Sequence, residues 1–121
     1  MHFGELYSAG NFIELQDVDT SGAAIVLNLN SAQQKTFAGD STIAAPAEIS
    51  LANAQNGREF FMTLTIDAGV ALTLPDDFEM DNALWDPVAK TWTPLDAGNY
   101  LMHVVWNGAA WYCSISQSQF A

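Results

Sequence analysis

Few residues of this chain could form a nucleophile and base pair, because its 121 residues include only two histidines and one cysteine. His103 lies in an alternating, strand-like segment, and no Gly-x-Ser-x-Gly motif is present. Cys113 falls on an apolar face, where a free cysteine packs as a small hydrophobic group. Nucleophilic catalysis requires the base beside the nucleophile. The sequence therefore predicts a protein that is not an enzyme and has no cofactor, with His103 in a structural or interface role.

One acidic segment resembles the first half of a calcium-binding loop. Asp17, Asp19 and Ser21 place oxygen ligands at alternate positions before Gly22. The second half does not follow, since Asn28 stands where such a loop carries a bidentate glutamate. An acidic hairpin loop explains the segment without a metal. We therefore expect no metal site. The candidate ligands that a calcium ion would use here are Asp17, Asp19 and Ser21.

A second acidic group follows Pro75 and has no regular ligand spacing. Such a group could hold a calcium or magnesium ion through water molecules. A chain with 14 acidic and three basic residues has acidic loops in any case, so a solvated loop is the expectation. The members of this group are Asp76, Asp77, Glu79, Asp81 and Asp86.

Two tryptophans could bind a ligand. Trp85 and Trp92 flank a loop or short hairpin, residues 86–91, whereas Trp106 and Trp111 are assigned to the core by the alternation around them. A flat apolar ring suits the face of a pyranose sugar. Trp85 and Trp92 are therefore the candidate carbohydrate-binding aromatics, and packing beneath the loop is the competing interpretation.

The charge of the chain excludes several classes of partner. A net charge of −11 repels both nucleic-acid phosphates and anionic membranes. The first ten residues contain no basic region and no apolar run, so we expect no secretory signal and synthesis in the cytoplasm. The charge-free stretch from Ala97 to Ala121 has a period of two and several polar interruptions, which is not the pattern of a membrane span.

The length and the spacing of apolar segments predict a single all-β domain. Half of the residues are hydrophobic and only 14% are charged, against about 25% in a typical soluble domain. Short segments rich in β-branched and aromatic residues recur between turn residues, which indicates one antiparallel β-sandwich spanning residues 1–121. Residues 1–10 are expected to form an extended N-terminal arm. The predicted strands are 12–16, 25–28, 35–38, 42–44, 48–51, 59–66, 70–74, 88–92, 100–106 and 111–116.

Two hairpins are predicted from turn residues. Asp67-Ala68-Gly69 would turn segment 59–66 back onto segment 70–74. Asn107-Gly108 favours a two-residue turn.

The second turn, with two residues in its loop, would pair Val104 with Trp111 and place both on a core face. The opposite face is polar but little charged, which is typical of a face covered by another sheet edge or another subunit. The residues expected at a subunit contact are Leu101, His103, Val105 and Tyr112.

The order of these turns and strands resembles the small β-domain of tailed-bacteriophage surface proteins, over about residues 24–120. The loop between Trp85 and Trp92 is longer than usual in that family, and Ile66 stands where a glutamine is common. The residues that carry the resemblance are Ile25 to Asn30, Gln34 to Phe37, Gly39 to Pro46, Asn56-Gly57, Phe60 to Ile66, Asp67-Ala68-Gly69, Leu74-Pro75, Trp85, Gly98, Tyr100 to Trp106, Asn107-Gly108, Trp111-Tyr112 and Phe120.

The resemblance implies a jelly-roll-like β-sandwich, usually trimeric, that carries no catalytic residues. Family members occur as head decorations, head fibres or tail-fibre tips. This chain shows neither heptads nor repeats that would build a fibre shaft. The expectation is therefore a capsid decoration or cement protein on the virion surface, assembled in the host cytoplasm and bound to the major capsid protein or other virion proteins. The alternative is a receptor- or carbohydrate-binding tip of a tail or head fibre, which would contact a host surface glycan.

Overall fold

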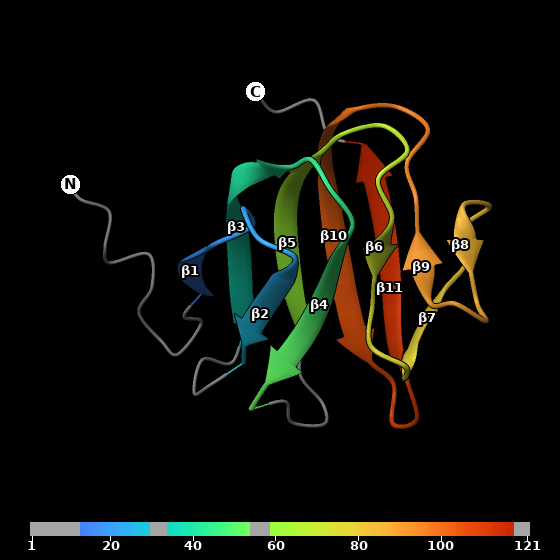
Figure 1. The fold of residues 1–121 in the computed structure, drawn as a ribbon. Coiled ribbons are helices and arrows are strands. Elements are labelled where there is room, and N and C mark those ends of the chain that lie inside the picture. The colour runs from blue at the N-terminus through green and yellow to red at the C-terminus, as the bar shows by residue number, and fades with distance from the viewer. Residues whose placement is uncertain (1–12, 30–33, 54–58, 118–121) are drawn as a thin grey trace.

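The protein is an all-β fold of two facing sheets in the computed structural model, which describes residues 13–29, 34–53 and 59–117 (Figure 1). The predicted N-terminal arm, residues 1–10, and the Asn56-Gly57 turn lie outside the described residues. Within the described ranges, no helix is long and apolar enough to cross a membrane. The predicted all-β class is confirmed.

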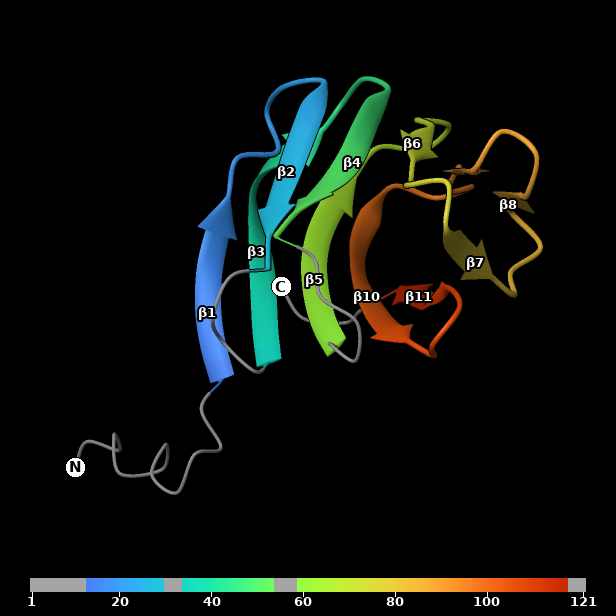
Figure 2. The same cartoon turned by 90° about the horizontal axis from the view of Figure 1, so that it is seen from below.

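The larger sheet has six strands and the smaller has five. Figure 2 shows β2 and β4 next to each other in one layer, over the ends of β3 and β5 in the other. In spatial order the larger sheet contains β1 (Ile13–Val18), β3 (Gln34–Ile43), β5 (Glu59–Ile66), β10 (Gly98–Trp106), β11 (Trp111–Gln117) and β7 (Phe78–Met80). The smaller sheet contains β2 (Ala24–Asn28), β4 (Ala47–Ala52), β6 (Leu72–Thr73), β9 (Thr91–Trp92) and β8 (Trp85–Asp86).

The first six strands alternate between the two sheets. As a result β1, β3 and β5 pair in parallel in one layer, and β2, β4 and β6 pair in parallel in the other. The prediction of purely antiparallel sheets is therefore wrong for this half, although β5, β10 and β11 are antiparallel neighbours. Alternation of apolar residues reports which side of a strand is buried but not the direction of its neighbour.

The predicted hairpin between segments 59–66 and 70–74 does not form. β5 pairs with β3 and β10, whereas β6 pairs with β4 and β9 in the other layer. After β5 the chain turns with the Val70 amide donating to the Asp67 carbonyl, and the Gly69 amide donates to the Pro94 carbonyl. Gly69 adopts a positive φ of 77°, as expected for a glycine in a turn. The sequence therefore predicts the position of the turn correctly, but not the sheet that the following strand joins.

The C-terminal hairpin forms with a longer loop than predicted. Trp106 pairs with Trp111, so the loop contains residues 107–110 and Val104 pairs with Cys113. The Asn107 side-chain oxygen accepts hydrogen bonds from the amides of Ala109 and Ala110 at 2.9 and 2.8 Å, which stabilises the four-residue loop. The predicted register is therefore wrong by two residues, but a shift of two leaves every side chain on its predicted face.

The remaining strand boundaries differ modestly from those predicted. Segments 35–38 and 42–44 belong mainly to one strand, β3, with a register irregularity between Ala38 and Thr42. Phe78–Met80 forms β7, which was not predicted. Segment 88–92 shortens to β9, because residues 86–90 form a turn closed by the Lys90 amide on the Asp86 carbonyl.

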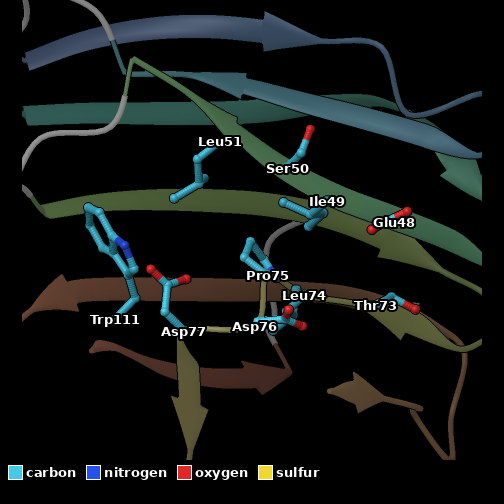
Figure 3. A pocket seen from close by; sticks show the side chains of 10 residues that line it. All are labelled: Glu48, Ile49, Ser50, Leu51, Thr73, Leu74, Pro75, Asp76, Asp77 and Trp111. Carbon is cyan, nitrogen blue, oxygen red and sulfur yellow. The ribbon is translucent and has the colours of Figure 1, made fainter. Parts of the chain in front are cut away.

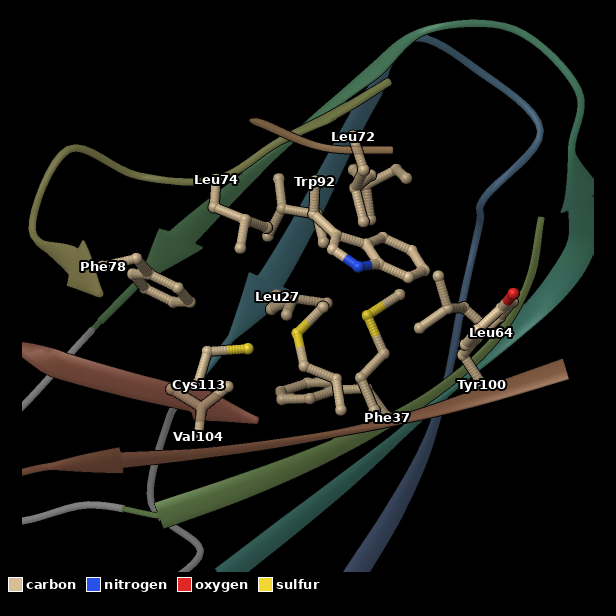
Figure 4. Packing of buried hydrophobic residues seen from close by; sticks show 14 of the residues in the cluster. Leu27, Phe37, Leu64, Leu72, Leu74, Phe78, Trp92, Tyr100, Val104 and Cys113 are labelled. Carbon is tan, nitrogen blue, oxygen red and sulfur yellow. The ribbon is translucent and has the colours of Figure 1, made fainter. Parts of the chain in front are cut away.

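The core lies between the two sheets and is centred on aromatic rings (Figure 4). Phe60 is fully buried and packs against Phe37 and Trp111, with ring centroids 5.7 and 5.9 Å apart. The strict alternation in β5 turns Phe60, Met62, Leu64 and Ile66 inward. The same strand therefore presents its other side chains on the outer face of the six-stranded sheet.

Candidate functional site

The acidic segment at residues 17–21 forms a turn whose own hydrogen bonds use its oxygens. The Asp19 carboxylate accepts hydrogen bonds from the Ser21 amide at 2.9 Å and from its hydroxyl at 2.6 Å. The bond from the Ser21 hydroxyl, and to a lesser extent the bond from its amide, lowers the pKa of Asp19. The two bonds therefore stabilise the fold at neutral pH, and this stabilisation is lost as the pH falls through the lowered pKa. Among the described residues, no three His, Cys, Asp or Glu side chains are grouped to hold a metal.

We expect calcium to leave the melting temperature unchanged, because Asp17 is exposed and Asp19 is already bonded within its turn. Thermal melts with calcium chloride and with a chelator should superimpose. Asp17→Ala and Asp19→Ala are the control variants. A calcium-dependent rise that both substitutions abolish would contradict this expectation and restore the metal-loop hypothesis.

Thr20 is the polar residue that ties this turn to the rest of the fold. Its side-chain hydroxyl donates to the Ser41 carbonyl at 2.6 Å and accepts from the Ser41 amide at 3.0 Å, and Thr20 is only 1% exposed. Thr20→Val removes both bonds at nearly constant volume, and should lower the free energy of unfolding by about 1–3 kcal/mol. Urea denaturation measures the loss. Thr42→Val, the same substitution at an exposed position of β3, is the matched control, and an equal loss in both variants would refute this role of Thr20.

Trp85 and Trp92 belong to the core and not to a sugar-binding platform. They are 9% and 2% exposed, and they face each other as a cross-strand pair of β8 and β9. Trp92 packs edge-on against Tyr100, with ring centroids 5.0 Å apart. Their indole nitrogens are buried without a hydrogen-bond partner. The carbohydrate-binding prediction for this pair is therefore wrong, because the small layer needs both rings to cover its side of the core.

The second acidic group is dispersed around the β6–β9 region. Asp86 accepts hydrogen bonds from the amides of Val88 and Ala89. Glu79 lies 3.7 Å from the Lys90 ammonium, which also donates to the Phe78 carbonyl at 3.1 Å. The acidic residues therefore do not form one site. Asp86 caps a turn and Glu79 forms an ion pair, whereas Asp76 and Asp77 line one surface hollow and Asp81 lines another.

The four predicted contact residues lie together on the outer face of the six-stranded sheet. Leu101, His103 and Val105 alternate outward along β10, and Val105 pairs with Tyr112 on β11. Tyr112 is 52% exposed and Val105 is 37% exposed. A hollow of about 300 Å³ on this face is lined by Asp81, His103, Val105, Tyr112, Cys113 and Ser114. The structure therefore brings the predicted residues into one patch.

His103 has two partners on β5 that the sequence did not assign to it. Its imidazole stacks on the Phe61 ring, with centroids 4.3 Å apart and an interplanar angle of 5°. Its Nε2 lies 2.5 Å from a Glu59 carboxylate oxygen. Alternation places Glu59 and Phe61 outward, but only the pairing of β5 with β10 brings them beside His103.

Cys113 is a buried residue, as predicted. It is 5% exposed, and burial raises the pKa of its thiol to about 12. The thiolate is the nucleophilic form of cysteine, so a thiol with this pKa stays protonated at neutral pH. Ser114, the outward neighbour of Cys113, lies opposite His103 in the register of β10 and β11.

A second hollow lies on the side of the smaller sheet and was not predicted. It has a volume of about 430 Å³ and separates β4 from residues 73–77, with Trp111 at one end (Figure 3). Glu48, Asp76 and Asp77 provide its carboxylates, and Ser50 a hydroxyl. We call it the β4 cleft. No sequence signal marks it, because it arises where two chain segments diverge in space.

The chain has no detected relatives that would assign a function to either hollow or to the outer face. No family model, curated protein or solved structure matches it. A functional proposal therefore depends on the surfaces of this protein and on the chemistry of the residues that form them.

Proposed function

We propose that this protein is a non-enzymatic structural protein of a bacteriophage virion, a decoration or cement protein of the capsid. The outer face of the six-stranded sheet carries this proposal. One row across five strands consists of Leu15, Thr36, Phe61, His103 and Ser114, in which the imidazole is the only ionisable group. A broad face with so little charge, on a chain of net charge −11, is suited to contact another protein surface.

The carboxylates on this face stand at its edges or are paired. Asp17 lies on the edge strand β1, Glu79 on the edge strand β7, and Asp81 just after it. Glu59 is bonded to His103. The uncharged centre exposes apolar groups, and burial of such groups between identical subunits removes them from water.

The trimeric state and the phage context come from the resemblance of the turns and strands to phage surface domains. Strong negative charge would keep free copies apart in the host cytoplasm until the apolar face meets another subunit or the major capsid protein. The symmetric contact would close as a trimer and leave the other surfaces free for the capsid.

The proposal is tested by locating the protein in virions. Mass spectrometry of purified particles should detect the chain, and electron microscopy with an antibody label should place it on the head. A label confined to tail or fibre tips would overturn the decoration assignment and support the receptor-binding alternative. Absence from purified virions would remove the virion assignment altogether.

A further inference from the structure

His103 stands in the interior of the outer face of the six-stranded sheet, where a neighbouring subunit would cover it. Its strand, β10, lies between β5 and β11 and is not at an edge of the sheet. The side chains of His103 and Glu59 are 36% and 40% exposed, and Glu59 pairs in register with Val105, a residue of the proposed subunit contact. The two ionisable groups are therefore accessible in the free subunit, and a subunit seated on this face would remove both from water.

The hydrogen bond to Glu59 determines where the imidazole takes up a proton. An ionised carboxylate can only accept, so the Nε2 atom of His103, 2.5 Å from the Glu59 oxygen, is the donor and carries a hydrogen. A further proton then binds at Nδ1, which has no hydrogen-bond partner in the described part of the chain. Stacking on Phe61 restrains the plane of the ring. Protonation therefore adds a positive charge against the Glu59 carboxylate without breaking the bond between the two side chains.

The other groups around His103 differ from it in the pH range where they ordinarily titrate. Ser114 lies opposite His103 on β11, and Tyr112 and Asp81 line the hollow beside it. Cys113 also lines this hollow, but burial raises the pKa of its thiol to about 12. From β5 come the carboxylate and the uncharged ring already described, and the outward neighbours along β10 are uncharged. Among these side-chain types, only imidazole ordinarily changes its charge between pH 5 and 8.

We propose that the His103–Glu59 pair makes subunit association sensitive to pH, with protonation of His103 strengthening the contact. This inference rests on the subunit contact of the proposed function. With a neutral imidazole, association buries a carboxylate beside an uncharged ring, between subunits that each have a net charge of −11. A protonated imidazole places a cation directly against that carboxylate, which lowers the cost of removing the carboxylate from water. It also makes each subunit less negative by one charge.

The direction of the pH dependence follows from linkage. Proton binding and association favour each other, because the coupling between two binding events is reciprocal. The trimer should therefore be strongest below the range in which histidine titrates, and the added strength should be lost as the pH rises through that range. Acid favours the trimer, and mildly alkaline conditions favour free subunits.

Sedimentation equilibrium of the full chain at pH 5.5 and pH 8.0, at constant salt, provides the test. The concentration at which half of the subunits are trimeric should be about tenfold lower at pH 5.5, within the usual range of coupling between binding events. Urea below the unfolding transition, at one concentration in all samples, brings a very tight trimer into the measurable range. Melting temperatures at both pH values show that each variant is folded.

Two substitutions at position 103 separate charge from shape. His103→Gln keeps a side-chain N–H for Glu59 but cannot be protonated, so it should remove most of the difference between the two pH values. His103→Arg is charged at both pH values and can stack on Phe61, so it should associate equally well at both. His2→Gln removes the other histidine of the chain and is the matched control, which should keep the full pH dependence.

Failure of this inference differs from failure of the proposed function. A trimer of equal strength at the two pH values, a His103→Gln variant with the pH dependence of the unmodified chain, or a His2→Gln variant without it would overturn the inference and leave the trimer in place. A chain that is monomeric at both pH values would refute the subunit contact and the inference together. Absence of the protein from virions would remove the virion assignment but not a measured pH dependence.

Discussion

Trp111→Ala is expected to lower the free energy of unfolding by about 3–5 kcal/mol, the usual cost of deleting a large buried aromatic side chain. Trp111 contacts the rings of Phe60, Phe78 and Trp106, with centroid distances of 5.9, 6.2 and 5.2 Å. These rings come from three other strands in the same sheet, whose ladders restrict collapse around the cavity. Urea denaturation followed by tryptophan fluorescence measures the loss.

Tyr112→Ala is the natural control for this substitution. Tyr112 is the next residue along β11 and is 52% exposed on the opposite face, so it should cost less than about 1 kcal/mol in the isolated subunit. Equal losses in the two variants would show that the inward and outward faces of β11 are wrongly assigned. Far-ultraviolet circular dichroism confirms that both variants keep the β-fold.

Tyr112→Glu is expected to convert the proposed trimer into folded monomers. The new carboxylate would lie within the proposed contact, where desolvation and repulsion from identical charges both oppose association. Glu79 is its outward neighbour on β7 and adds to that repulsion. Light scattering coupled to size-exclusion chromatography measures the mass, and the melting temperature of the monomer shows that the fold survives.

Tyr112→Phe keeps the ring and adds no charge, so it should remain trimeric. Raising the salt concentration should strengthen the unmodified trimer, because screening weakens repulsion between subunits of net charge −11. A monomeric unmodified chain at micromolar concentration would refute the subunit contact. A trimer that tolerates Tyr112→Glu would refute this face as the site of contact.

The local pattern of the sequence determined which side of each long strand is buried. In β5 and β10, inward Phe60 and Val104 alternate with outward Phe61 and His103, as the sequence predicts. This inference succeeds because side chains alternate strictly along an extended backbone, whatever its neighbours are. It also survived the error in the C-terminal register, because the four-residue loop shifts the pairing by two.

The burial of Trp85 and Trp92 could not be predicted from alternation along a strand. Trp85 and Trp92 flank a turn, and the sequence alone left open whether their rings pack beneath it or face a ligand. Tyr100, which is eight residues beyond Trp92 in the chain, packs against it in the folded protein. Burial of these rings therefore depends on contact between the two sheets, which no local pattern encodes.

Strand neighbours were decided by the tertiary structure. Asp67-Ala68-Gly69 marks a turn in the sequence, but the same residues serve a hairpin or a crossing to the opposite layer, because either path buries one apolar face of each strand. The crossing was selected by packing between the layers. The same packing placed Glu59 beside His103 and opened the β4 cleft at Trp111, whereas the all-β class and the inward faces followed from the sequence because they depend only on local alternation.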